Sequence, residues 1–310
     1  MNKEFEFKSC TGKNVYAKMW FNEEVKNKKG IIQLVHGMQE HIGRYDEFAN
    51  VLANAGYIVI GHDHLGHGNT AKKEEEFGYF AKKDGWDKLV TDIHILQNQI
   101  KNEYPDLPYV IMGHSMGSLL VRTYLTKYKD DIQGAIISGT SGQKTGLISG
   151  MLLTKLIMTF KGERYKSNLL EYLVTGSFNK KFKPNRTKSD WTTRDYEQVD
   201  KFIKDDKCGK NFTAVAYYDL LKGTYYLSKQ KNVNKTLNVP ILIFSGDKDP
   251  VGENSKGVIR VYNMLNKAGL DNVKIRLFKD GRHEMLNEIN KEEVYYYILD
   301  WLSKNINESK

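Results

Sequence analysis

Six short apolar segments place the strongest constraint on the fold of this chain. They occupy residues 30–37, 56–64, 108–115, 134–139, 239–249 and 273–278. Such near-continuous apolar runs are typical of strands that are buried on both faces of a parallel sheet. Helical spacing of apolar residues follows in several of the intervals, at 44–56, 85–105, 115–128, 255–269 and 291–306. The alternation predicts an α/β fold, with a mostly parallel sheet and helices on both of its faces.

The alternation stops between residues 139 and 240. About a hundred residues lie there, where about fifteen would complete one helical crossover. This segment is rich in Tyr, Phe and Lys and its pattern is mostly helical. We therefore expect a helical cap inserted at residues 141–235, in a core formed by residues 1–140 and 236–310.

The positive charge of the chain is concentrated in this expected cap. The whole chain has a net charge of +9, and residues 141–235 carry 19 Lys and Arg against 9 Asp and Glu. A basic surface attracts nucleic acid, anionic lipid or acidic substrates. A general preference for Lys in the chain would explain the same excess without a partner. No nucleic-acid motif accompanies the charge, so we expect no nucleic-acid partner and a candidate peripheral contact with an anionic membrane.

The start of the chain lacks the apolar segment of a signal peptide, and no run of 18 apolar residues is present. Cys10 and Cys208 are too few for a disulfide framework. We expect a cytoplasmic protein with two free thiols, which touches a membrane at most peripherally.

Ser115 lies at the end of an apolar run and at the start of a helical one, in the sequence GHSMG. Gly113 and Gly117 allow strand and helix to approach closely, so this pattern predicts a strained turn that exposes the serine hydroxyl. The helix would also direct its N-terminal N–H groups toward negative charge at this point. A serine that simply caps the helix is the alternative.

A serine hydroxyl needs a base to become a nucleophile, and the base needs an orienting carboxylate. In folds with this type of turn, the chain order is Ser, acid, His. Of eight histidines, His283 alone follows Ser115, and it comes just after the last expected strand. Asp247 and Asp249 both follow the preceding strand. We favour Asp249 as the acid because it lies further past the strand, although turn formation explains either aspartate.

Attack on a carbonyl creates an oxyanion, which requires two hydrogen-bond donors. The backbone N–H of Met116 directly follows the candidate nucleophile. The loop after the first buried strand should supply the second donor, from Met38.

Three histidines, His62, His64 and His67, have the spacing H-x-H-x-x-H. This spacing resembles the first half of the metallo-β-lactamase signature, but Gly66 stands where those enzymes have an aspartate. We favour a turn with hydrogen-bonded histidines, and we expect neither a metal nor a cofactor.

Five motifs together resemble α/β-hydrolases of the monoacylglycerol lipase and lysophospholipase group. They are residues 36–45, 61–68, 113–118, 245–252 and 280–288. The resemblance implies the α/β-hydrolase fold and serine-dependent hydrolysis of acyl esters beneath a lid. Position by position, it implies the nucleophile Ser115, the acid Asp249, the base His283 and the oxyanion donors Met38 and Met116.

The same resemblance implies that Glu40 and Arg44 organise the alcohol side of the substrate pocket, although an i,i+4 ion pair would explain them equally. The expected substrate is lipid-like, a monoacylglycerol or a lysophospholipid. A thioester or a small carboxylic ester would use the same residues, and a non-catalytic binding protein is the rival from another class.

The most apolar segment of the expected cap spans residues 146–160. It is too short to cross a bilayer. A helix buried between cap and core is one interpretation. A lid helix that meets membrane lipid through Leu153 and Ile157 is the other.

Overall fold

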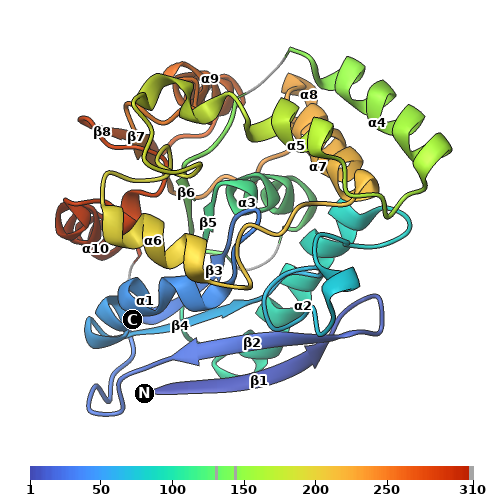
Figure 1. Cartoon of the computed structure of the whole chain (residues 1–310). Coiled ribbons are helices and arrows are strands. Elements are labelled where there is room, and N and C mark those ends of the chain that lie inside the picture. The colour runs from blue at the N-terminus through green and yellow to red at the C-terminus, as the bar shows by residue number, and fades with distance from the viewer. Residues whose placement is uncertain (130–131, 143–144, 307–310) are drawn as a thin grey trace.

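One eight-stranded sheet forms the centre of the computed structural model, which describes residues 1–129, 132–142 and 145–306 (Figure 1). The strand order is β1-β2-β4-β3-β5-β6-β7-β8. β2 pairs antiparallel with β1 and β4, and the remaining neighbours are parallel. The strands are β1 Asn2–Lys8, β2 Asn14–Trp20, β3 Gly30–Val35, β4 Tyr57–His62, β5 Tyr109–His114, β6 Gly134–Ser138, β7 Ile241–Gly246 and β8 Val273–Phe278. The expected α/β fold with a mostly parallel sheet is confirmed.

Helices cover both faces of this sheet, and this explains the near-continuous apolar runs. Every residue of β3 to β7 is buried. In β3, Ile32 and Leu34 belong to the hydrophobic cluster that includes α1 and α10, whereas Ile31 and Val35 belong to the cluster that includes α2, α3 and α9. These helices are α1 Asp46–Asn54, α2 Gly85–Glu103, α3 Met116–Lys127, α9 Lys256–Lys267 and α10 Lys291–Asn305.

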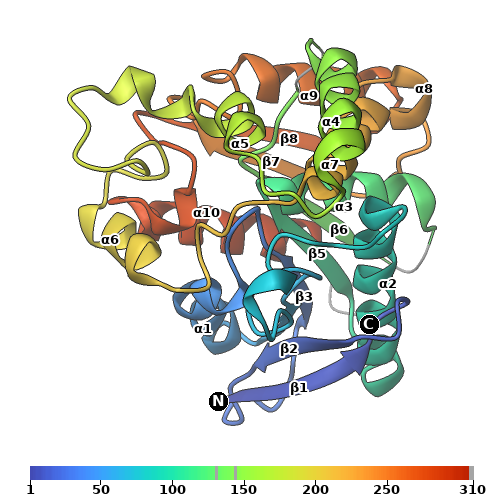
Figure 2. The same cartoon turned by 45° about the vertical axis from the view of Figure 1, so that its right-hand side comes forward.

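The segment between β6 and β7 is helical and lies within the range expected for the cap. Its helices are α4 Leu147–Lys161, α5 Asn168–Thr175, α6 Tyr196–Lys204, α7 Ala214–Leu227 and α8 Gln230–Val233. α7 packs on α2 and α3, and α4 packs along α7 at the periphery of the molecule (Figures 1 and 2). α7 therefore connects the outer part of the cap to the core.

One face of α4 is exposed. Four apolar side chains, spaced by four residues, form what we call the α4 stripe, with exposed fractions of 55 to 76%: Ile148, Leu152, Leu156 and Phe160. Leu153 and Ile157 instead lie partly buried against the core cluster. The expectation that Leu153 and Ile157 form the outer face is therefore wrong, because packing on α7 sets the rotation of the helix.

None of the helices in the described ranges is long and apolar enough to cross a membrane. Cys10 is exposed and Cys208 is buried, and both are free thiols, as expected.

Candidate active site

Ser115 occupies a strained turn between β5 and α3. Its backbone angles are φ 53° and ψ −121°, a conformation that L-residues rarely adopt. A Cβ on Gly113 would lie 2.3 Å from the carbonyl oxygen of Gly117, and a Cβ on Gly117 would lie 2.0 Å from that of Val35. Both glycines are therefore required for the close approach of strand, helix and neighbouring strand, as the GHSMG pattern predicts.

The Ser115 side chain is available for chemistry. Ser115 is partly exposed, and its backbone N–H donates to Ser138 O at 3.0 Å. Its hydroxyl makes no hydrogen bond to any residue in the described ranges. The hydroxyl therefore does not cap α3, and the turn presents it at the carboxyl end of the sheet.

His283 and Asp249 form a buried hydrogen-bonded pair. His283 Nδ1 lies 3.0 Å from Asp249 Oδ2, and the two residues are 3% and 0% exposed. Asp249 also accepts hydrogen bonds from Ser245 Oγ and from the Val251 N–H, both at 2.9 Å. These bonds fix the carboxylate, so that Nδ1–H donates to it and Nε2 is left free to act as a base.

The other candidate acid lies elsewhere: Asp247 Oδ2 approaches Lys248 Nζ at 3.5 Å. The geometry thus favours Asp249 over Asp247 as the orienting carboxylate.

The charges around His283 favour its protonated form. Burial by itself would lower the pKa of His283, but the Asp249 carboxylate raises it above its ordinary value. Conversely, burial would raise the pKa of Asp249, and His283 holds it below its ordinary value. The pair is therefore suited to stabilise an imidazolium ion.

His283 lies against the residue that precedes Ser115. The rings of His114 and His283 are 4.7 Å apart between centroids. Gly139, which directly follows β6, lies beside both rings, and a Cβ at this position would lie 3.1 Å from each of them. The structure therefore brings the expected base and nucleophile to the same edge of the sheet.

The loop after β3 runs beside Ser115. A Cβ on Gly37 would lie 3.0 Å from Ser115 Cβ, and Gln39 has a positive φ of 60°. In the part of the chain that the structure describes, no backbone acceptor is found for the N–H groups of Met38 and Met116. Both groups remain candidates for binding an oxyanion.

Glu40 and Arg44 form an i,i+4 ion pair, with 2.7 Å between Arg44 Nη1 and Glu40 Oε2. Such a pair is the alternative to a contact with the substrate alcohol that the sequence left open. Glu40 Oε1 also accepts the Gly37 N–H at 2.6 Å and the Tyr45 hydroxyl at 2.9 Å. Arg44 reaches across to Glu284, which directly follows His283. Glu284 is not among the site residues expected from the sequence, because no local pattern links it to an arginine 240 residues away.

The chain resembles known hydrolases over nearly its full length. Residues 26–290 match the family described as Hydrolase_4, serine aminopeptidase, S33. The chain belongs to this α/β-hydrolase family. A thermostable carboxyl esterase from Bacillus coagulans, solved in complex with glycerol, is 28% identical, with a TM-score of 0.92 over 98% of this chain and 99% of the esterase. A monoacylglycerol lipase of Mycolicibacterium smegmatis is 24% identical over 98% of each chain.

A monoglyceride lipase of mouse is also 24% identical, over 96% of this chain and 89% of the relative. The resemblance noted in the sequence is thus confirmed at the level of the family and of these relatives. The chain falls among the carboxylic ester hydrolases.

Four histidines of this hydrolase form a buried cluster of tilted and edge-on rings: His36, His62, His64 and His67. His62 Nε2 and His64 Nδ1 lie 3.2 Å apart and hydrogen-bond to each other. Burial lowers the pKa of His62 to about 3 and that of His67 to about 4, and it holds the pKa of His36 and His64 well below the ordinary value. The cluster is therefore neutral at physiological pH. The H-x-H-x-x-H spacing therefore belongs to packed, hydrogen-bonded histidines.

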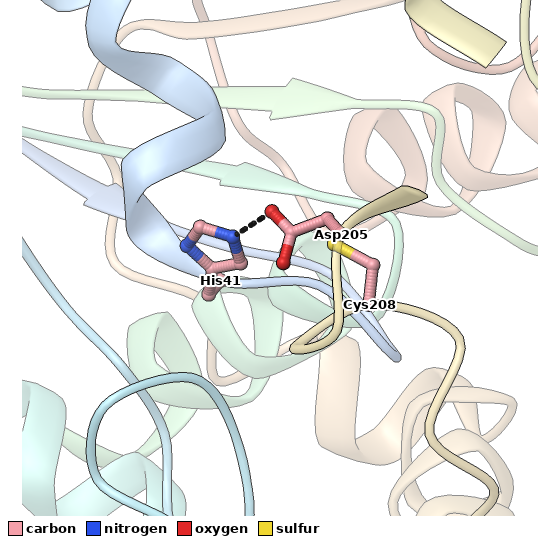
Figure 3. A group of neighbouring side chains, drawn as sticks. All are labelled: His41, Asp205 and Cys208. Atoms are coloured by element: carbon pink, nitrogen blue, oxygen red, sulfur yellow. Dashed lines mark hydrogen bonds and ion pairs between the residues drawn. The ribbon is translucent and has the colours of Figure 1, made fainter. Parts of the chain in front are cut away.

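A second cluster joins the hydrolase core to the cap. It comprises His41, Asp205 and Cys208, whose ligand-type atoms all lie within 4.8 Å of one another; no other such group of three occurs in the described ranges (Figure 3). His41 Nδ1 accepts the Gly43 N–H at 3.2 Å, so Nε2 carries the proton and donates to Asp205 at 2.8 Å. A cation at Nε2 would have to displace that proton. We therefore interpret the cluster as a hydrogen-bonded contact that holds cap and core together.

The cap also covers the candidate base. The Trp191 ring lies 5.1 Å from the His283 ring, at an angle of 36°. Residues 190–194, which we call the strap, are hydrogen-bonded to residues 282–288. The bonds are Glu284 N–H to Thr192 O at 2.7 Å, Thr193 Oγ to Asn287 O at 2.8 Å, Arg194 Nε to Glu288 at 2.9 Å, and Arg282 to the carbonyls of Asp190 and Thr193. The length and composition of residues 141–235 predict a cap, but nothing in the sequence indicates this contact.

Proposed function

We propose that this hydrolase cleaves a monoacylglycerol or a lysophospholipid through an acyl-enzyme on Ser115. One observation carries the proposal: the buried pair of Asp249 and His283 lies at the same sheet edge as the strained turn that exposes Ser115. A nucleophile, a base and an orienting acid are the requirements for acyl transfer from an ester.

In the first half of the reaction, Ser115 Oγ attacks the ester carbonyl carbon while His283 Nε2 takes the hydroxyl proton. Asp249 keeps the resulting imidazolium oriented and stabilises its charge. The N–H groups of Met38 and Met116 bind the oxyanion of the tetrahedral intermediate. The intermediate collapses by breaking the bond to the alcohol oxygen, which receives the proton from His283.

In the second half, water attacks the acyl-enzyme. His283 takes one proton from the water, and the hydroxide oxygen bonds to the carbonyl carbon. Collapse of the second intermediate breaks the bond to Ser115 Oγ, which recovers its proton from His283. The products are one fatty acid and one alcohol, and no cofactor is needed.

The relatives support a glycerol-containing lipid as the substrate. The similar proteins include monoacylglycerol lipases, and the carboxyl esterase was solved with glycerol. A thioester or a small carboxylic ester would react by the same steps, and the family description adds peptide substrates as a further class. The expected contacts of Glu40 and Arg44 with the alcohol compete with the ion pairs that these residues make within the protein.

The α4 stripe supports a peripheral contact between a cytoplasmic enzyme and an anionic membrane. Its four apolar side chains are exposed, and Lys155 and Lys161 lie on the same helix. α5 exposes three more apolar residues, Leu169, Tyr172 and Leu173. Apolar side chains would enter the interface while Lys and Arg are attracted to the anionic surface.

A covalent probe and a substrate panel test the proposal. An organophosphonate should label Ser115, and the purified protein should hydrolyse long-chain monoacylglycerol or lysophospholipid faster than thioesters, short esters or aminoacyl amides. Ser115→Ala is the blank, and it should retain the fold and lose the activity. Labelling at another residue, or full activity of Ser115→Ala, would refute the mechanism. A folded protein without activity on any of these compounds would favour a binding function.

A further inference from the structure

A buried series of ion pairs joins the two loops that carry the proposed oxyanion donor and the proposed base. Glu40 binds the Gly37 N–H, next to Met38, and also binds Arg44. Arg44 donates from its two terminal nitrogens to the two carboxylate oxygens of Glu284, at 3.0 and 2.7 Å. Because Glu284 directly follows His283, Arg44 fixes the distance between the two loops through a bidentate contact.

The charges of this series do not balance. Two carboxylates, Glu40 and Glu284, surround the single guanidinium of Arg44, and their side chains are only 5%, 8% and 10% exposed, respectively. One negative charge therefore remains buried in the cluster. Burying such a charge is costly unless something nearby compensates it. The imidazolium that forms on His283 during the reaction is a cation in a position to do so.

We propose that Arg44 and Glu284 are positioning residues of the hydrolase: their bidentate pair sets the oxyanion loop against the base loop, and the surplus negative charge stabilises protonated His283. The inference rests on the proposed function. It also gives Glu40 and Arg44 a role that needs no direct contact with the substrate alcohol.

The charged and titratable groups around His283 agree with this role. Burial would lower the pKa of His283, but Asp249 raises it most, and Glu284 and Glu40 raise it further. His114, whose ring lies against the ring of His283, is neutral, because burial lowers its pKa to about 4. Burial would raise the pKa of Glu284, but the charge of Arg44 lowers it to about 2, so Glu284 is an anion at any practical assay pH.

The test is Glu284→Gln, which keeps the side-chain shape and removes the charge. His283 must be neutral to accept a proton, so kcat/KM rises with pH through the pKa of His283. Loss of the anion lowers this pKa. The acid limb of the profile should therefore move to lower pH by about half to one unit, and the plateau kcat should fall about three- to tenfold. KM should change little. An acid limb that stays in place would overturn the electrostatic role.

Glu288→Gln is the matched control. Glu288 lies in the same loop and is also buried and ion-paired, but its partner is Arg194 of the cap. The acid limb of Glu288→Gln should coincide with that of the wild type. If both variants move the limb equally, the effect is not specific to Glu284 and the proposal is refuted.

Arg44→Lys tests the geometric part separately, because lysine keeps the charge but cannot make two parallel bonds to one carboxylate. We expect a lower kcat with an unmoved acid limb, and an unchanged kcat would refute the geometric role. Imidazole NMR titration of His283 in each variant reports its pKa without any turnover. The inference can thus be tested even if the wild type hydrolyses no ester, an outcome that would refute only the proposed function.

Discussion

Replacement of Leu152 and Leu156 by Ser should weaken the proposed binding of the protein to membranes without unfolding it. These side chains are 63% and 55% exposed, so the folded protein loses few internal contacts. Full burial of a leucine side chain stabilises by about 1.5–3 kcal/mol, and covering the exposed part in a bilayer interface should contribute about 1 kcal/mol for each residue. The double variant should therefore bind vesicles about thirtyfold more weakly, because 1.4 kcal/mol corresponds to a factor of ten.

The assay is co-sedimentation with vesicles of phosphatidylcholine and phosphatidylglycerol. Two hydrolysis rates are measured beside it, one on a long-chain and one on a short-chain ester. Hydrolysis of a long-chain monoacylglycerol in vesicles should fall with binding, while hydrolysis of a short water-soluble ester should be kept. Raising the salt concentration should weaken binding further, because the attraction of the cap lysines is screened beyond about 10 Å at 0.1 M.

Leu153→Ser with Ile157→Ser is the matched control on the same helix. Both residues pack against the core cluster, so this pair should lower the thermal midpoint and reduce the two rates together. Wild-type vesicle binding by the Leu152 and Leu156 variant would refute membrane contact through the α4 stripe. Equal loss of both rates in that variant would show that the stripe supports the fold instead.

Three further outcomes follow from the site and the cap. Asp249→Asn should lower kcat by about three to four orders of magnitude, whereas Asp247→Asn should have a much smaller effect; the reverse ranking would assign the acid to Asp247. Burial raises the pKa of Asp219 in α7 to about 7, above its ordinary 3.8, so its carboxyl opposes folding increasingly as the pH rises from about 4 to 7. Asp219→Asn should therefore raise the free energy of unfolding at pH 8 by up to about 4 kcal/mol and change it little at pH 4, as urea titrations at both values would show; equal changes would refute this assignment. A metal chelator should leave the hydrolysis rate unchanged, and inhibition that zinc reverses would identify a metal at the four-histidine cluster or at the cluster of His41, Asp205 and Cys208.

The sheet and the turn at Ser115 could be predicted because their signals are local. A strand buried on both faces must be apolar throughout, and a strand that turns sharply into a helix needs glycines at fixed positions. His283 could be chosen because it is the one histidine that follows Ser115. The hydrogen bond from His283 now favours Asp249 over Asp247, a choice that position along the chain could only suggest.

Contacts between cap and core could not be predicted in the same way. The rotation of α4 depends on how it packs along α7, and the apolar residues of α4 occupy most of its circumference, so periodicity gave no preferred face. Arg44 and Glu284 lie 240 residues apart, and His41 and Asp205 lie 164 apart. Such pairs have no periodic signature, because only the completed fold brings them together.

The strap has a consequence for engineering this family. Residues 190–194 belong to the cap by chain order but are hydrogen-bonded to residues 282–288, which carry His283. A cap transplanted from a relative would therefore introduce foreign partners for the loop of the proposed catalytic base. Successful chimaeras should exchange residues 190–194 and 282–288 together, or leave both in place and replace only the outer helices α4 and α5. The boundary between the parts that can be exchanged and the parts that must stay together thus lies within the cap. It does not coincide with the ends of the insertion.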